Sequence, residues 1–164
     1  MEFPRVFLGT GELVFATSPC EVKTILGSCV GVALYDPRNR WGGLCHYLLA
    51  NDPDLESGDT PGSSTRFGQV AIPALAQKLV RAGSNRRDIV AVVAGGALLL
   101  DANEVFFVGE KNIRLANSLL ESLGIAVIHR DIGGDRGRRM VFRPHDGTFG
   151  IELLSGTDPD TLTI

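Results

Sequence analysis

Two apolar segments joined by four polar residues constrain the fold of this chain more than any other feature of its sequence. Residues 28–36 (SCVGVALYD) and 41–49 (WGGLCHYLL) have the length and apolar content of buried β-strands. The intervening PRNR, residues 37–40, has the polar character of a turn. If the hairpin closes around a two- or four-residue turn, residues whose numbers sum to 77 lie opposite each other. The sequence therefore predicts which side chains of the two strands share a face.

This register brings a cysteine and a histidine together. It places Cys29 opposite Leu48 and His46 opposite Gly31, so that Cys29 and His46 are diagonal neighbours with Cα atoms roughly 7–8 Å apart. Val30 and the residues that alternate with it point to the opposite face, toward a core. A register shift of one residue would send the cysteine and the histidine to opposite faces.

A thiol beside an imidazole is suited to acyl transfer. The imidazole is expected to lower the pKa of the Cys29 thiol from about 8.5 by stabilising a thiolate–imidazolium pair. The thiolate attacks an amide carbonyl, and His46 protonates the leaving amine and later activates water. Gly27 and Ser28 would present backbone N–H groups to the oxyanion. A cysteine and a histidine on adjacent strands are also common core residues, so spacing alone leaves both interpretations open.

The rest of the chain predicts one domain, residues 1–164. Gly9 and Gly11 make residues 5–16 an uneven strand or bulged ribbon. The acidic, turn-rich segment 51–64 is expected to be a mobile surface loop that borders the site, and 155–164 a frayed tail. Further strands are expected at 88–97, 125–134, 138–142 and 148–154, and helices at 67–79 and 110–123.

Two details of these helices are specific. The first helix either begins near Ile72 or is kinked at Pro73, and the second is expected to end at Gly124. Strands and helices mix without a regular βαβ alternation. This favours an α/β (α+β) layered sandwich with two main helices and mixed, mostly antiparallel β-sheets.

Composition excludes several classes of function. The net charge of −3 gives no electrostatic footprint for nucleic acid, and no apolar run approaches the length needed to enter a membrane. Three cysteines are an odd number without metal-type spacing, which favours a reducing, cytoplasmic setting and no metal. The thioester route needs only water, so no cofactor is expected. Cys20 and Cys45 are predicted to be structural.

Six segments occur in an order that resembles the chemoreceptor glutamine deamidases of the CheD family. The resemblance extends over roughly residues 8–152. The segments are TILGSCVGVALYDP, GGLCHYLLA, RFGQVAIPAL, AVVAGGALLL, VGEKN and DIGGDRGRRMVF. It implies a layered fold related to that of bacterial toxin deamidases. It also implies hydrolysis of selected glutamine side chains on methyl-accepting chemotaxis receptors, which feeds receptor adaptation.

The resemblance also implies roles for residues and partners. Cys29 corresponds to the family's nucleophile and His46 to its histidine. The family's third polar residue is a threonine six positions before the cysteine, where this chain has Lys23; Thr24, five before, is the candidate partner of the imidazole. The receptors are the expected partners, with a CheC-type phosphatase as a further one, and the chain is expected to act as a monomer. Asn112 and Lys111 are candidate receptor contacts.

Two alternatives remain beside the deamidase. The first is a non-catalytic adaptor that binds the receptor or the phosphatase. The second is a different thiol enzyme, an amidase or a transglutaminase-like acyl transferase, that acts on other proteins. The adaptor predicts that Cys29→Ala leaves the cellular role intact, and the second enzyme predicts activity on substrates other than receptors.

Overall fold

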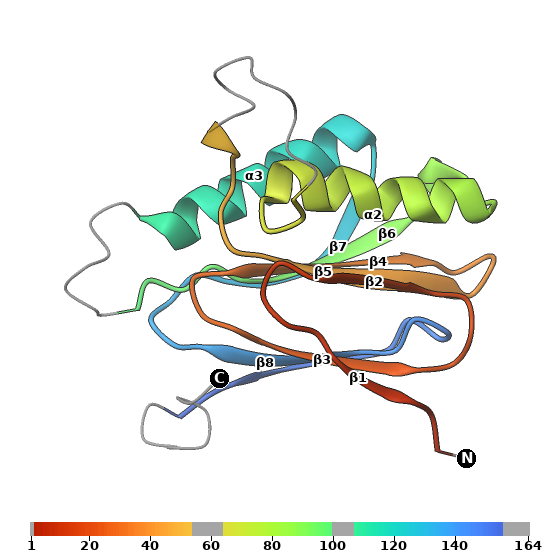
Figure 1. Ribbon diagram of the computed structural model, residues 1–164, viewed down its shortest axis with the longest axis horizontal. Helices are drawn as coiled ribbons and strands as arrows, with labels where there is room; N and C mark the ends of the chain where they lie inside the picture. The colour runs from red at the N-terminus through yellow and green to blue at the C-terminus, as the bar shows by residue number, and fades with distance from the viewer. Residues whose placement is uncertain (1, 54–63, 100–106, 156–164) are drawn as a thin grey trace.

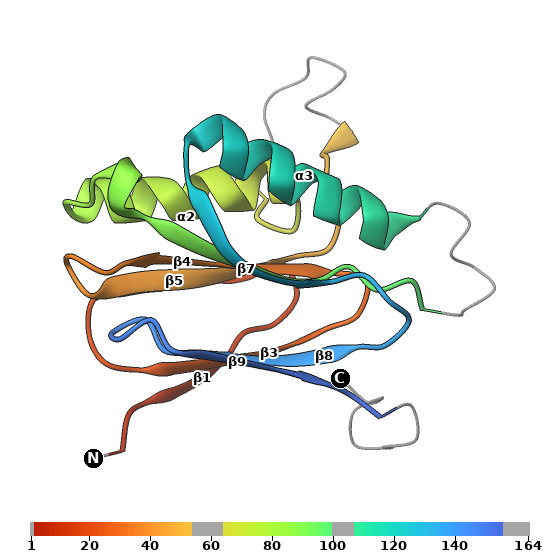
Figure 2. The ribbon, with the colours of Figure 1, turned by 180° about the vertical axis from the view of Figure 1, so that it is seen from behind.

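The described residues form three layers. The computed structural model describes residues 2–53, 64–99 and 107–155. Helices α2 (Gly68–Ala82) and α3 (Val108–Leu123) cover one face of a five-stranded sheet, and a four-stranded sheet covers its other face (Figures 1 and 2). This confirms the predicted layered sandwich with two main helices. The proposed loop 51–64 and tail 155–164 lie outside the described residues, apart from 51–53, 64 and 155.

The five-stranded sheet contains the predicted hairpin. Its order is β2 (Leu13–Ala16), β5 (Trp41–Tyr47), β4 (Val30–Asp36), β6 (Val90–Gly95) and β7 (Ala126–Ile132), with only β6 and β7 parallel. Gly31 pairs with His46, and Val30 with Tyr47, which confirms the register. The pairing ends at Val30, so Cys29 lies in the turn before β4 and the expected pairing of Cys29 with Leu48 is wrong.

The four-stranded sheet has the order β1 (Arg5–Phe7), β3 (Glu21–Leu26), β8 (Arg138–Phe142) and β9 (Phe149–Leu153). Only β1 and β3 run parallel, so both sheets are mixed and mostly antiparallel, as predicted. The sequence interpretation missed β3, although its buried residues alternate with more exposed ones. That alternation was available as a signal.

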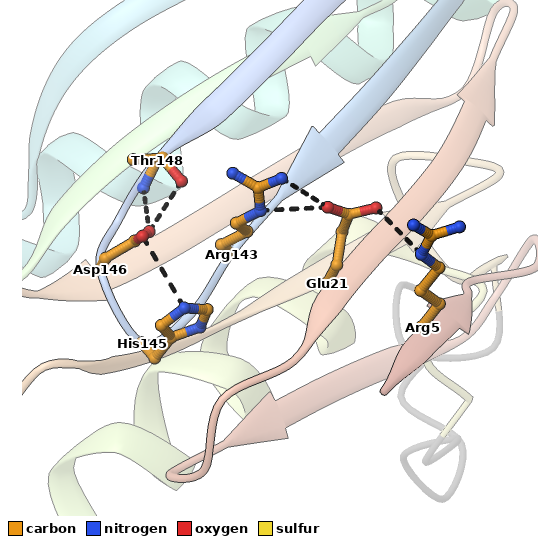
Figure 3. Close-up of polar contacts among 6 residues, drawn as sticks. All are labelled: Arg5, Glu21, Arg143, His145, Asp146 and Thr148. Carbon is orange, nitrogen blue, oxygen red and sulfur yellow. Dashed lines mark hydrogen bonds and ion pairs between the residues drawn. The ribbon is translucent and has the colours of Figure 1, made fainter. Parts of the chain in front are cut away.

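A polar cluster joins the strands of this sheet (Figure 3). Glu21 on β3 accepts hydrogen bonds from the Arg143 guanidinium at 2.8 and 3.0 Å and lies 3.9 Å from Nε of Arg5. In the turn between β8 and β9, Asp146 accepts two hydrogen bonds from Thr148. These partly exposed contacts support the sheet and contribute little stability individually.

The segment 5–16 corrects one prediction. It forms two strands in different sheets, β1 beside β3 and β2 beside β5, where one uneven strand was expected. The chain crosses between the sheets over residues 8–12, and Gly11, with φ +82°, adopts a backbone conformation that favours glycine. The crossing is held by hydrogen bonds from Gly11 N–H to the His46 carbonyl and from His46 N–H to the Glu12 carbonyl.

Two apolar cores lie on the two faces of the five-stranded sheet. Because side chains alternate along a strand, Cys45 packs into the core beneath the helices, whereas Leu44 packs between the sheets. Helix α2 begins at Gly68 and runs through Pro73, so the alternative start near Ile72 is wrong. Helix α3 ends at Gly124 in the left-handed conformation, as predicted.

Candidate active site

The candidate residues come from both sheets. His46 lies on β5 of the five-stranded sheet, and its side chain faces the space between the sheets with 3% exposure. Thr24 lies on β3 of the four-stranded sheet and faces the same space with 0% exposure. The half-buried Cys29 lies in the turn that joins β3 to β4. The site therefore forms where the two sheets meet.

Thr24 determines which imidazole nitrogen of His46 carries the proton. The Thr24 hydroxyl donates to the Leu8 carbonyl at 2.7 Å, and the same oxygen lies 2.7 Å from Nδ1 of His46. A hydroxyl has one proton to donate, so in its contact with His46 it accepts from Nδ1–H. The neutral imidazole therefore carries its proton on Nδ1, which leaves Nε2 with the lone pair of a general base.

The Nε2 atom has a neighbour that the sequence interpretation missed. The hydroxyl of Thr10, in the exposed segment that crosses between the sheets, lies 3.4 Å from Nε2 of His46. Since Nε2 has the lone pair, Thr10 is the donor in this contact. No local sequence pattern predicts this contact, because it depends on how residues 8–12 cross from one sheet to the other past His46.

The turn that carries Cys29 is fixed by the end of β6. The Cys29 carbonyl accepts from Gly96 N–H at 2.9 Å, and the Gly27 carbonyl accepts from Ala97 N–H at 3.0 Å. Gly95 has φ +104°, and a Cβ there would lie 2.3 Å from the Cys29 carbonyl oxygen. Only glycine therefore allows this close approach.

The backbone N–H groups near the thiol are the candidate oxyanion donors. Within the described residues, the N–H groups of Ser28 and Cys29 have no hydrogen-bond partner in another residue. The backbone N–H of Cys29 interacts with the sulfur of the same residue. This contact favours the thiolate, because it lowers the pKa of the thiol. An oxyanion formed by attack of the sulfur would develop close to this donor.

Burial favours the neutral forms of both Cys29 and His46. It raises the pKa of the Cys29 thiol to about 11 and lowers the pKa of His46 to about 4, although the nearby Glu12 carboxylate opposes the shift at His46. Burial therefore opposes the thiolate–imidazolium pair expected from the sequence. Burial also raises the pKa of Cys45 to about 12, as expected of a structural cysteine.

Asn112 is not the surface residue that the sequence suggested. It is fully buried on α3, and its Nδ2 donates to the carbonyls of Ser28 and Leu48, both at 3.0 Å. A residue in this position is not available as a receptor contact. Its sequence surroundings, VGEKN, contain charged neighbours that gave no indication of burial.

Other types of site find no support in the described part of the chain. All three cysteines are free. Residues 2–53, 64–99 and 107–155 contain no group of three or more His, Cys, Asp or Glu side chains that could hold a metal ion. In the same residues, no helix has both the length and the apolar character needed to cross a membrane.

Comparison with known proteins assigns the family. Residues 48–152 match the family model CheD, described as chemotactic sensory transduction. A probable chemoreceptor glutamine deamidase CheD 1 of Anaeromyxobacter dehalogenans is 40% identical over 151 residues, covering 92% of this chain and 85% of the relative. The chain belongs to the CheD family. Similar proteins include a probable chemoreceptor glutamine deamidase CheD of Sulfurimonas denitrificans, 33% identical over 96% of this chain and 99% of the relative.

The region compared includes the candidate site. The CheD family model begins at residue 48, after Cys29 and His46, but the match to the Anaeromyxobacter protein covers 151 of the 164 residues and so spans both positions. Among solved structures, the hypothetical protein YfiH of Bacillus licheniformis has a TM-score of 0.49 at 17% identity, covering 73% of this chain and 50% of that protein. That likeness is too weak to support an argument about fold or function.

Proposed function

We propose that this CheD protein is a chemoreceptor glutamine deamidase. It hydrolyses the side-chain amide of selected glutamines on chemoreceptors, which gives glutamate and ammonia. The observation that carries the proposal is the family membership, with relatives named as probable chemoreceptor glutamine deamidases at 33–40% identity over most of the chain. The hydrogen bond between Thr24 and Nδ1 of His46 supports the choice of catalytic residues.

In the first half of the reaction, Cys29 is the nucleophile. Because its thiol is protonated at rest, the proton passes to Nε2 of His46 as sulfur attacks the amide carbon. The N–H groups at Ser28 and Cys29 stabilise the oxyanion. The imidazolium then donates this proton to the leaving nitrogen, the C–N bond breaks, and ammonia leaves a thioester on Cys29.

In the second half, water hydrolyses the thioester. Nε2 of His46 takes a proton from water as its oxygen attacks the thioester carbon, and the C–S bond breaks. The proton returns to sulfur, and glutamate is released. Thr24 acts throughout by holding Nδ1, so that Nε2 exchanges the proton at each step. Water is the only co-reactant, and no cofactor takes part.

The partners follow from this proposal. The chain acts as a monomer on the cytoplasmic helices of the receptors, where the glutamines lie, and a CheC-type phosphatase is a second partner. A cytoplasmic location agrees with three free cysteines. The site accepts a glutamine that projects from a helix.

The test is direct deamidation of a receptor. A purified cytoplasmic receptor fragment from the same organism is incubated with the protein, and peptide mass spectrometry follows the gain of about 1 Da for each converted glutamine. We expect wild type to convert defined glutamines and Cys29→Ala and His46→Ala to convert none. Cys45→Ala is the matched control. It removes the thiol of the residue next to His46, and this thiol is buried in the core beneath the helices, away from the site.

Each alternative predicts a different result. If no glutamine changes while wild type and both variants still bind the fragment, the protein is an adaptor. If glutamines change only in other proteins, or if an added amine is incorporated in place of water, it is a thiol amidase or acyl transferase with other substrates.

A further inference from the structure

Helix α3 contributes a buried amide to the neighbourhood of the candidate site. Asn112 is 0% exposed, and its Nδ2 donates to the Ser28 carbonyl and to the Leu48 carbonyl, both at 3.0 Å. Ser28 precedes Cys29, and Leu48 lies two residues after His46. One side chain thus connects the turn that carries the thiol to the residue just after the strand that carries the imidazole.

These contacts fix the orientation of the amide. Both partners are carbonyl oxygens, which only accept, so the nitrogen of Asn112 must face them. The oxygen Oδ1 is consequently left buried and without a hydrogen-bond partner among the described residues. A buried hydrogen-bond acceptor without a partner reduces stability. Packing alone therefore does not explain why an asparagine occupies this position.

The geometry of the hairpin supplies that explanation. Backbone pairing between β4 and β5 ends at Val30 and Tyr47, and no further backbone pair joins the strands toward Cys29. The two N–H groups of Asn112 bridge the strands beyond this last pair. Tyr47 reinforces the bridge, because its hydroxyl donates to the backbone carbonyl of Asn112.

The bridge completes the support of the thiol turn. The carbonyls of Gly27 and Cys29 accept from backbone N–H groups at the end of β6, and the carbonyl of Ser28 accepts from Asn112. All three successive carbonyls of the turn are therefore held, and only one of them depends on a side chain. Substitution of Asn112 therefore removes the hydrogen bond to the Ser28 carbonyl and leaves the two backbone hydrogen bonds of the turn in place.

We propose that Asn112 is a positioning residue that holds the Cys29 turn in register with the His46 strand. Among the described residues, its side chain donates hydrogen bonds to the Ser28 and Leu48 carbonyls, and it acts through the backbone of these neighbours of the thiol and the imidazole. The inference rests on the proposed deamidation for its kinetic consequences, whereas its effect on the accessibility of Cys29 is independent of that function.

The test replaces Asn112 with leucine, which has a similar shape and donates no hydrogen bonds. With the receptor fragment, we expect kcat of Asn112→Leu to fall about 100-fold with little change in KM, because the reacting groups are misplaced while the docking surface is intact. Asn117→Leu is the matched control on the same helix, since the Asn117 side chain accepts a hydrogen bond from Arg130 on β7, away from the turn that carries Cys29. We expect its kcat to equal that of wild type.

A second measurement does not require the receptor. Release of the turn should expose Cys29 and increase its alkylation by iodoacetamide at neutral pH about tenfold or more, and shift the pH profile of alkylation downward. Asn112→Ser, which keeps one donor, provides a second variant with smaller expected effects if the leucine variant does not fold. Wild-type kcat and an unchanged alkylation profile in a folded variant would overturn the inference. If wild type deamidates nothing, the proposed function fails, and alkylation alone decides the role of Asn112.

Discussion

The hydroxyl of Thr24 lies 2.7 Å from Nδ1 of His46, although the two residues belong to different sheets. The orientation of the imidazole therefore depends on how the sheets pack against each other as well as on the hairpin that carries the histidine. Thr24 uses its only proton on the Leu8 carbonyl, which makes it an acceptor toward His46.

Replacing Thr24 tests this relationship. In Thr24→Val the imidazole loses its acceptor, so Nε2 is no longer fixed as the base, and we expect kcat to fall about 10-fold to 100-fold. The Leu8 carbonyl also loses its donor, which should cost about 1–3 kcal/mol of unfolding free energy. Thr24→Ser keeps the hydroxyl and should retain most of the activity. The measurements are deamidation kinetics and thermal unfolding, and equal kcat for the valine and serine variants would contradict the role of the hydroxyl.

The neutral resting state predicts a slow thiol. Because burial raises the pKa of Cys29 to about 11, its alkylation by iodoacetamide should be slower than that of free cysteine at neutral pH. The rate should still be rising between about pH 8 and about pH 10. Peptide mass spectrometry resolves Cys29 from Cys20 and Cys45. A plateau near neutral pH would instead indicate a preformed ion pair with His46.

Burial of His46 also predicts how stability depends on pH. Its pKa in the folded protein, about 4, lies below the ordinary value of 6.5. Between these two pH values the unfolded chain therefore binds a proton at His46 that the folded protein does not bind. The contribution of the neutral His46 to the free energy of unfolding is fully present above pH 6.5 and is lost as the pH falls toward about 4. It amounts to about 3 kcal/mol in total.

Denaturant unfolding at several pH values measures this contribution. His46→Gln should flatten the dependence between about pH 4.5 and about pH 7. His129→Gln, which replaces an exposed histidine on β7, should behave as wild type. Identical slopes for wild type and His46→Gln would show that the histidine does not resist protonation.

The glycine beneath the thiol turn gives a fourth prediction. In Gly95→Ala the new Cβ would meet the Cys29 carbonyl, so the turn must move, and we expect kcat to fall at least about 10-fold. Gly124→Ala is the control, because Gly124 also has a positive φ but no atom lies within 4 Å of a Cβ there. It should lose only about 1–2 kcal/mol of stability. Full activity of Gly95→Ala would show that the position of the turn is not critical.

The sequence was sufficient to predict contacts that follow from local periodicity. The length of the turn between the two hairpin strands determines the register that pairs Gly31 with His46. Gly124 ends its helix because a left-handed residue there satisfies the last carbonyls. These features depend on neighbours in sequence or on one turn.

Contacts between layers could not be obtained in this way. The meeting of Thr24 with His46 requires the stacking of two sheets, and the approach of Thr10 requires the chain to cross between them. The pattern of glycines in 5–16 indicated an irregularity but not that the two halves join different sheets. The pKa of Cys29 likewise depends on burial by distant segments, which raises it.

The division of the site between two sheets has a consequence for the newly made protein. A chain in which only the hairpin has formed already contains the thiol and the imidazole, but the imidazole is not yet oriented, because Thr24 belongs to the other sheet. Hydrolytic activity should therefore emerge only after the two sheets have docked. Molecules in which the two sheets have not docked should then hydrolyse no glutamine side chains.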